Sequence, residues 1–228
     1  MNHDWDKIYR DMSSYYEARA QEYDEFYIGK SPAIPRPESY TRDVEKIGEM
    51  VKSFGRGHVI DIACGTGFWL RYYARNCSRI TLFDYSEKML AVCKKRVDDL
   101  CLEDKCSFVR GDFFEYTFGE RSFDSTLVGF FICHLSPQQE ERFFLKVNKF
   151  LRPHGQFMII DSCWSHERAH YRNKEGIQER TLNDGRTFTI YKRYFDESDI
   201  KEIFNKYALK LEALYMGNVF FGAVGLKS

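Results

Sequence analysis

A short strand that runs directly into a glycine-rich turn constrains this chain more than any other feature. Val59–Ile62 has three aliphatic residues around Asp61, a pattern typical of a short buried strand, and the sequence continues Ala63-Cys-Gly-Thr-Gly67. Gly65 and Gly67 carry no Cβ, so the backbone can turn tightly there and approach a ligand closely. A helical pattern follows from Phe68. The stretch therefore predicts the nucleotide-binding start of a doubly wound α/β domain.

Composition bounds the size and the partners of the protein. A chain of 228 residues is long enough for one good-sized domain, or for one domain with a cap. The 34 basic and 34 acidic residues cancel, so no overall field attracts nucleic acid or an anionic membrane. Apolar runs such as Leu127–Cys133 are far shorter than a membrane span, and the first residues lack the apolar core of a signal peptide.

The seven cysteines indicate a reducing compartment. Their number is odd and no Cys-x-x-Cys pair occurs, which favours free thiols over a disulfide framework or a zinc site. We therefore expect a cytoplasmic protein that holds no metal and has no nucleic-acid or membrane partner.

Beyond the glycine turn, strand and helix patterns alternate, which predicts a mostly parallel sheet covered by helices. Ser86 and Ser136 stand where a side chain can cap the start of a helix. After residue 161 the rhythm breaks, and a polar segment with a helix around His166–Arg180 is expected. Expected strands are 59–62, 79–83, 106–110, 124–133, 156–161, 186–194, 209–216 and 218–226. Expected helices are 14–24, 40–54, 68–74, 86–100, 136–150 and 197–207, with a proline loop at 31–37 and a turn at 152–155.

Acidic side chains at three predicted strand ends favour an adenosine ligand that carries a cationic group. Asp84 lies where a carboxylate can accept hydrogen bonds from both ribose hydroxyls, although a helix-capping aspartate would look the same. Asp112 can accept from an adenine amino group with Phe113 against the base, or can simply form a turn. Asp61 suits a cationic amine better than a pyrophosphate, which it would repel.

These motifs occur in an order that resembles class I S-adenosylmethionine (SAM) methyltransferases across roughly residues 44–160. Asp61–Gly67 reads Asp-x-Ala-x-Gly-x-Gly, with Ala63 where many members have glycine, and Leu151–Gly155 is a Leu-Arg-Pro-x-Gly turn frequent in that family. The resemblance implies a Rossmann-like, doubly wound α/β sheet of seven strands, mostly parallel with an antiparallel last strand. It also implies SAM as cofactor and S-adenosylhomocysteine (SAH) as product. The cofactor residues expected on this basis are Tyr16, Arg19, Tyr23, Asp61, Ala63, Gly65, Gly67, Trp69, Asp84, Tyr85, Met89, Gly111, Asp112, Phe113 and Gly129.

Cations outside the glycine-turn region favour a small anionic methyl acceptor. Arg180, Arg186 and Lys192 suit a carboxylate or phosphonate, which is ionised near neutral pH and needs no strong base. Taken singly, each is more readily a solvated surface charge. Lys192 is more informative, because in the alternating strand 186–194 either it or Arg193 must face the covered side of the sheet.

A closer resemblance bears on the acceptor. The stretches Tyr15–Asp24, Gly65–Trp69 and Arg180–Lys192 are similar to the phosphonate O-methyltransferase of dehydrophos biosynthesis, whereas the proline loop at 31–37 departs from its pattern. The resemblance implies that Arg180 and Lys192 hold the anion and that Tyr27 lies near an active-site tyrosine.

His134 completes the expected acceptor site. It follows a predicted strand, where methyltransferases often place a residue that faces the acceptor, so it can orient the acceptor or act as a base. A core or helix-cap histidine is the alternative. We expect catalytic roles for His134, Tyr27 and Lys192, and substrate contacts from Arg180, Arg186 and Lys192. Residues 1–40 are expected to form an N-terminal helical lid on a methyltransferase domain, 41–228, with an acceptor-covering insertion at about 162–187.

Several functions stay open beside an O-methyltransferase for a small anionic molecule. The acceptor can instead be a thiol, a neutral hydroxyl or arsenic, and a non-catalytic SAM sensor would share the cofactor motifs. An NAD-dependent reductase is disfavoured because Gly-x-Gly-x-x-Leu lacks the third small residue of the dinucleotide fingerprint. Nucleic-acid methylation is disfavoured because Phe130–His134 replaces the Asn/Asp-Pro-Pro-Tyr/Phe motif. The sequence leaves the acceptor's identity and the oligomeric state open.

Overall fold

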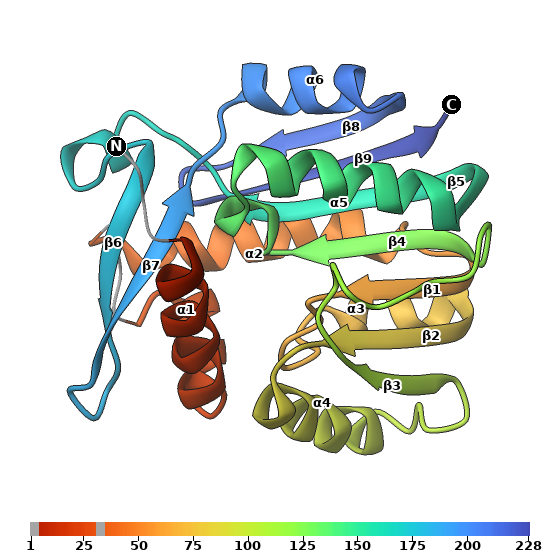
Figure 1. Ribbon diagram of the computed structural model, residues 1–228, viewed down its shortest axis with the longest axis horizontal. Helices are drawn as coiled ribbons and strands as arrows, with labels where there is room; N and C mark the ends of the chain where they lie inside the picture. Colours follow the sequence, from red (N-terminus) through yellow and green to blue (C-terminus); the bar gives the residue numbers. More distant parts are fainter. Residues whose placement is uncertain (1–4, 31–34) are drawn as a thin grey trace.

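A computed structural model describes residues 5–30 and 35–228, and its centre is a twisted seven-stranded sheet (Figure 1). The strand order is β3-β2-β1-β4-β5-β9-β8. The first five strands run parallel to their neighbours, and β9 is antiparallel to both β5 and β8. The predicted fold class is therefore confirmed. The strands are β1 Gly57–Ile62, β2 Cys77–Asp84, β3 Cys106–Arg110, β4 Phe123–Gly129, β5 Leu151–Ser162, β8 Leu209–Met216 and β9 Phe220–Lys227.

Helices cover both faces of this sheet because its strands are apolar on both sides. Val59 points into one core and its neighbour Ile60 into the other, as alternation along a strand requires. Side chains of α2, α3 and α4 fill the first core, and those of α5 and α6 fill the second. The helices are α2 Pro37–Lys52, α3 Leu70–Tyr73, α4 Glu87–Asp99, α5 Pro137–Phe150 and α6 Glu197–Lys206.

The predicted serine caps are confirmed. The Ser86 hydroxyl accepts a hydrogen bond from the Met89 amide at the start of α4. Ser136 and Gln139 form a reciprocal capping box at the start of α5, with Pro137 at the first helical position. The sheet order reverses between β1 and β4, and in open α/β sheets ligands bind at such a switch point, beyond the carboxyl ends of the strands.

The predicted helix around His166–Arg180 is wrong. Only Arg168–His170 forms a 3₁₀ turn, and β6 (Glu175–Thr181) pairs in antiparallel register with β7 (Thr187–Arg193) as a separate hairpin. Exposed and half-buried residues alternate along β6, a period of two that its long polar side chains conceal in the sequence.

Other boundaries also shift. The strand expected at 124–133 ends at Gly129, because Phe130 adopts a positive φ of 52° and Ile132–His134 forms a 3₁₀ turn. The turn expected at 152–155 lies inside β5 as an irregularity in its pairing with β4. Residues 31–34 of the expected proline loop lie outside the described residues, and Pro37 already begins α2.

The N-terminal segment packs on the hairpin. The helix α1 runs over Trp5–Arg19, earlier than the predicted 14–24, and a 3₁₀ turn follows at Tyr23–Ile28. Tyr15 of α1 lies in one apolar cluster with Leu182 and Ile190, and α1 runs beside β7 (Figure 1). Together, α1, the 3₁₀ turn and the hairpin form what we call the cap.

Two acidic residues tie the cap to the glycine-turn side of the sheet. Glu17 accepts a hydrogen bond of 2.5 Å from the Ser86 hydroxyl at the start of α4. Asp24 accepts one of 2.6 Å from Thr66 in the glycine turn and pairs with Arg96 at 2.5 Å. Among the helices described, none has the length and apolar character needed to cross a membrane.

Candidate cofactor and acceptor cavities

Two adjoining cavities lie where the strands end and the cap begins. The larger has a volume of about 780 Å³, within the range of small-molecule sites. Its wall combines α1, the glycine turn and the carboxyl ends of β2, β3 and β4. The predicted cofactor residues that line it are Tyr16, Tyr23, Ala63, Gly65, Asp84, Tyr85, Met89, Gly111, Asp112, Phe113 and Gly129.

Asp84 holds the glycine turn against the start of α4. One carboxylate oxygen accepts from the Gly65 amide at 2.8 Å and the other from the Ser86 amide at 2.9 Å. Burial raises the pKa of Asp84 to about 6, although the backbone amides act in the opposite direction. Each carboxylate oxygen has two lone pairs, so Asp84 keeps acceptor capacity for a ligand in the larger cavity.

Three predicted cofactor residues support the turn instead of lining the larger cavity. Asp61 is 4% exposed and accepts a 2.7 Å hydrogen bond from the Tyr73 hydroxyl of α3. A Cβ on Gly67 would meet Cys93 Sγ at 2.7 Å, so this glycine permits close packing on α4. Trp69 lies in the core against aromatic rings. A direct ligand contact by these three is thus not supported.

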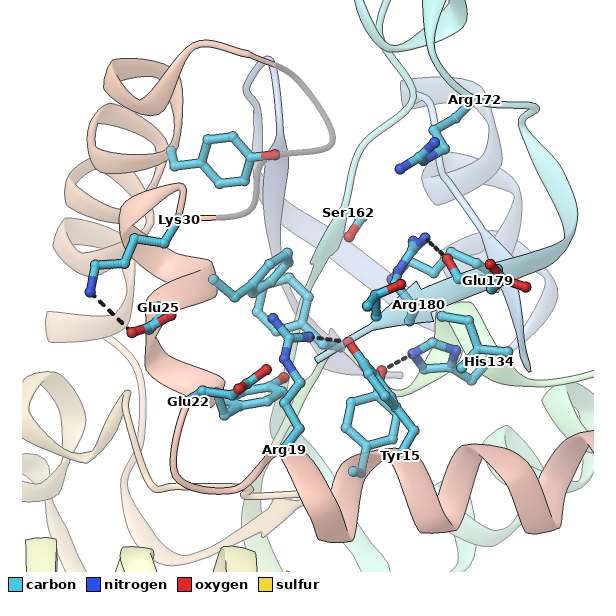
Figure 2. A pocket seen from close by; sticks show the side chains of 18 of the residues that line it. Tyr15, Arg19, Glu22, Glu25, Lys30, His134, Ser162, Arg172, Glu179 and Arg180 are labelled. Atoms are coloured by element: carbon cyan, nitrogen blue, oxygen red, sulfur yellow. Dashed lines mark hydrogen bonds and ion pairs between the residues drawn. The ribbon is translucent and has the colours of Figure 1, made fainter. Parts of the chain in front are cut away.

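The smaller cavity, of about 270 Å³, lies between α1, the 3₁₀ turn at Tyr23–Ile28 and the hairpin (Figure 2). Its wall is rich in cations, and two of them are nearly inaccessible: Arg168 is 2% exposed and Lys192 is 6% exposed. Glutamates stand on the same wall. The charged residues that line it are Arg19, Glu22, Glu25, Lys30, Arg168, Arg172, Glu179, Arg180 and Lys192.

Lys192, not Arg193, is the strand residue that faces inward. Its ammonium lies 3.3 Å from Asp161 Oδ1 and 2.7 Å from Cys133 Sγ, whereas Arg193 pairs with Glu140 at 2.8 Å. Burial disfavours the charge on Lys192, but Cys133 and Asp161 outweigh it and raise the pKa of Lys192. The cavity wall therefore carries a protonated lysine at neutral pH.

The predicted contribution of Arg186 is not supported. It lies in the exposed turn of the hairpin, where its guanidinium pairs with Asp184 at 2.7 Å, and it lines neither cavity. Tyr27 also lines neither cavity, because its ring turns into the core and stacks on Phe68 with 3.7 Å between centroids. Arg19 lines the smaller cavity rather than the larger and donates to the Tyr15 hydroxyl at 2.7 Å (Figure 2).

Sequence reasoning missed a cluster around Tyr194. The Arg168 guanidinium lies 4.3 Å from the centre of the Tyr194 ring, and Arg180 donates to its hydroxyl at 3.4 Å. Burial works against ionisation of this phenol, but Arg168, Lys192 and Arg180 lower its pKa. Asp161 was detectable as an acidic residue at the end of a predicted strand. Arg168 was not, because its segment was assigned to a helix.

Four residues line both cavities and form their boundary: Tyr16, Tyr23, Phe130 and His134. The Tyr16 hydroxyl lies 2.6 Å from His134 Nε2, and His134 Nδ1 lies 2.6 Å from the Tyr191 carbonyl oxygen. Burial and the nearby Lys192 hold the pKa of His134 well below its ordinary value. The predicted His134 is thus at the junction of the two cavities.

Known proteins share this architecture. Residues 59–155 match the family described as methyltransferase domain. The DhpI–SAM–HEP complex superposes with a TM-score of 0.78 at 23% identity, covering 99% of both chains, and the DhpI–SAH complex with 0.73 at 25% identity, covering 96% of both. This chain contains a class I SAM-dependent methyltransferase domain.

Curated relatives match the methyltransferase domain more locally. Sterol 24-C-methyltransferase ERG6 of Saccharomyces cerevisiae is 30% identical over 164 residues, which cover 70% of this chain. The C-methyltransferase UbiE of Blochmanniella pennsylvanica is 26% identical over 106 residues, 45% of this chain. The chain spans about two fifths of the length of each, with 40% and 41% covered.

In this methyltransferase domain, Asp61 gives stability a definite pH dependence. Burial raises its pKa to about 7, so the folded state holds the proton more tightly than the unfolded state. Unfolding free energy should therefore fall as pH rises from about 4 to 7, by on the order of 3 kcal/mol from this group. Asp61→Asn removes this part of the slope. Urea unfolding at pH 4.5 and 7.5 measures this change in unfolding free energy, and the exposed Asp98→Asn is the control. An equal change between the two pH values in wild type and Asp61→Asn would contradict the prediction.

Proposed function

We propose that the protein transfers the methyl group of SAM to an oxygen of a small anionic acceptor. SAM occupies the larger cavity, and the acceptor occupies the smaller one. The observation that carries this proposal is the cationic wall of the smaller cavity, which adjoins the larger cavity at Tyr16 and His134.

The charge balance of that wall favours an anion. Across residues 5–30 and 35–228, no carboxylate oxygen lies within 4.0 Å of the guanidinium nitrogens of Arg168, Arg172 or Arg180, whereas Lys192 is paired with Asp161. Arg168 instead donates to two backbone carbonyls, and the Nε of Arg172 is buried without a partner among those residues. Unneutralised cations in a confined site are costly, and an anionic ligand offsets that cost.

The larger cavity fits SAM. Asp84 offers carboxylate lone pairs at the end of β2, where a ribose can donate both hydroxyls. Asp112 accepts a hydrogen bond from the Phe114 amide at 2.7 Å, so it forms the turn that the sequence allowed as an alternative. Its second carboxylate oxygen stays available to the larger cavity, where we place the adenine. Gly65 has a φ of 54°, so the turn needs a residue that tolerates the left-handed region.

The chain's contribution to the reaction is positioning. Bound SAM supplies a methyl group made electrophilic by its sulfonium. Arg180 and Lys192 hold the anion so that one oxygen points across the boundary toward the methyl group. That oxygen donates the electron pair of the new O–C bond while the S–C pair stays on sulfur, so no proton has to move. Alignment of this kind supplies much of the rate enhancement without a general base.

The cap excludes water from this reaction. The Asn183 amide donates to Glu22 at 3.1 Å, and the Asn183 side chain donates to Glu25 at 3.0 Å, which joins the hairpin turn to the N-terminal segment. We therefore retain residues 1–40 as a lid and about 162–187 as the acceptor-covering insertion on the 41–228 domain. DhpI, a SAM-dependent phosphonate methyltransferase, supports an oxygen acceptor, whereas UbiE and ERG6 are C-methyltransferases.

Binding and transfer assays test the proposal. Calorimetry should show binding of SAM and SAH but not of NAD. With radiolabelled SAM, label should move to an alkylphosphonate or a carboxylate and not to a neutral alcohol or a thiol of the same size. Binding of NAD alone would contradict the cofactor assignment, and transfer only to the neutral alcohol or the thiol would contradict the acceptor class.

A further inference from the structure

The boundary between the cavities holds a hydrogen-bond chain whose direction is fixed. It runs from the Tyr16 hydroxyl to His134 Nε2 at 2.6 Å, and from His134 Nδ1 to the Tyr191 carbonyl at 2.6 Å. A carbonyl oxygen carries no hydrogen, so Nδ1 must be the donor in the second bond. His134 is neutral near pH 7, because burial and Lys192 lower its pKa. A neutral imidazole has one N–H, and therefore Nε2 presents a lone pair.

The tyrosine oxygen is left as a pure acceptor. With a lone pair on Nε2, the Tyr16 hydroxyl has to donate its only hydrogen to His134. Burial raises the pKa of Tyr16 well above its ordinary value, so the phenol keeps that hydrogen. Tyr16 Oη then shows lone pairs, and no hydrogen, to the two cavities that it lines.

The position of that oxygen selects its ligand. A methyl group that passes from one cavity to the other must cross at the residues common to both walls, and the polar ones are Tyr16, Tyr23 and His134. Both ring nitrogens of His134 are already engaged. An ionised acceptor oxygen has no hydrogen to give, so it would be repelled by Tyr16 Oη. Tyr23 also brings a hydroxyl to this boundary, and the sulfonium methyl group, which is polarised positively, is the donor that SAM brings to it.

We propose that Tyr16 Oη is a catalytic contact for the sulfonium methyl group, and that His134 is the positioning residue that turns the Tyr16 lone pairs toward it. The contact is a set of C–H···O interactions, each individually weak, on a group that also carries positive charge. It exists with SAM and disappears with SAH, which has neither the methyl group nor the charge. This inference rests on the proposed function for the identity of the cofactor but not for that of the acceptor.

Calorimetry with SAM and SAH tests the contact without any acceptor. Tyr16→Phe should weaken SAM binding about 3- to 10-fold, as expected for a few weak hydrogen bonds, while SAH affinity changes less than about twofold. Tyr116→Phe, on a ring that lines neither cavity and packs against Phe83, is the matched control and should change neither affinity.

His134 variants test the positioning role. His134→Leu should lower the SAM-to-SAH preference as Tyr16→Phe does, and His134→Gln should restore part of it, because an amide oxygen can accept the Tyr16 hydrogen. An unchanged preference in Tyr16→Phe, or equal losses for SAM and SAH, would overturn the inference. If Tyr16→Phe does not fold, His134→Leu and His134→Gln still report the SAM-to-SAH preference.

The outcomes separate this inference from the proposed function. Failure of the wild type to bind SAM overturns both. Binding of SAM with no transfer to any anion overturns the acceptor class alone, and the affinity ratios still decide the role of Tyr16. A loss of turnover in Tyr16→Phe confined to acceptors that must lose a proton, with the SAM-to-SAH preference unchanged, would show a proton relay and overturn the methyl contact.

Discussion

Asp84→Ala is expected to weaken SAM binding about 100-fold. The variant loses a buried carboxylate that, in our proposal, accepts from both ribose hydroxyls, and hydrogen bonds to charged groups contribute about 1.5–3 kcal/mol each. It also leaves the Gly65 and Ser86 amides without their acceptor, which loosens the glycine turn. Calorimetry with SAM measures the effect. Glu87→Gln, three residues on and exposed to solvent, is the matched control and should bind as wild type.

The charge of Asp84 gives the same contact a pH signature. Because the pKa of Asp84 is about 6, SAM affinity should fall as pH drops through 6 and the carboxylate takes up a proton. Asp84→Asn should bind SAM about tenfold more weakly than wild type at pH 7.5, and its own affinity should not follow this titration. Wild-type affinity in Asp84→Ala, or an unchanged titration in Asp84→Asn, would refute the ribose contact.

Lys192→Gln is expected to lower kcat/KM for an anionic acceptor about 100-fold, with SAM affinity preserved. The ammonium is buried, and loss of one preorganised donor to the reacting group in a water-excluded site costs about 2.7–4 kcal/mol. Glutamine still offers an amide hydrogen to Asp161, so the buried carboxylate is not left alone. Steady-state transfer from labelled SAM gives kcat/KM, and calorimetry gives the affinity for SAM.

A matched variant separates local charge from position. Arg186→Gln removes a cation from the same hairpin, but its partner is the exposed Asp184, so kcat/KM should change less than twofold. Arg180→Gln, on the cavity wall, should cost about tenfold. If Lys192→Gln and Arg180→Gln were as active as Arg186→Gln, the cationic grip on the acceptor would be the wrong explanation for this cavity.

The parallel part of the sheet could be predicted because its signals are local. Apolar strands, serine caps and the glycine turn act within a few residues, so β1, β2, β3, α4 and α5 lie close to where periodicity places them. The acidic residues at strand ends were found for the same reason, since carboxyl ends of parallel strands meet at one edge. Even so, the backbone position of Asp61 did not reveal that its carboxylate faces Tyr73 instead of the cavity.

The acceptor side could be predicted only in part. Alternation limited the inward residue to Lys192 or Arg193, and the choice depended on partners far away in the chain, Asp161 and Glu140. Strand β7 was predicted, but β6 was mistaken for part of a helix, because pairing with a second strand supplies hydrogen bonds that local propensity does not report. That error also concealed Arg168.

The sequence by itself therefore determined the sheet, the glycine turn and Asp84 at its side, because backbone conformation and capping depend on near neighbours. The tertiary structure decided which partner each of the cavity side chains has. It packs Arg168 against the Tyr194 ring, pairs Lys192 with Asp161, and brings Tyr16 into hydrogen-bond contact with His134, 118 residues away in the chain. Those contacts arise from packing of the cap on the strand ends. Burial there lowers the pKa of His134, whereas Cys133 and Asp161 raise the pKa of Lys192 against the effect of burial, and the proposed chemistry depends on both protonation states.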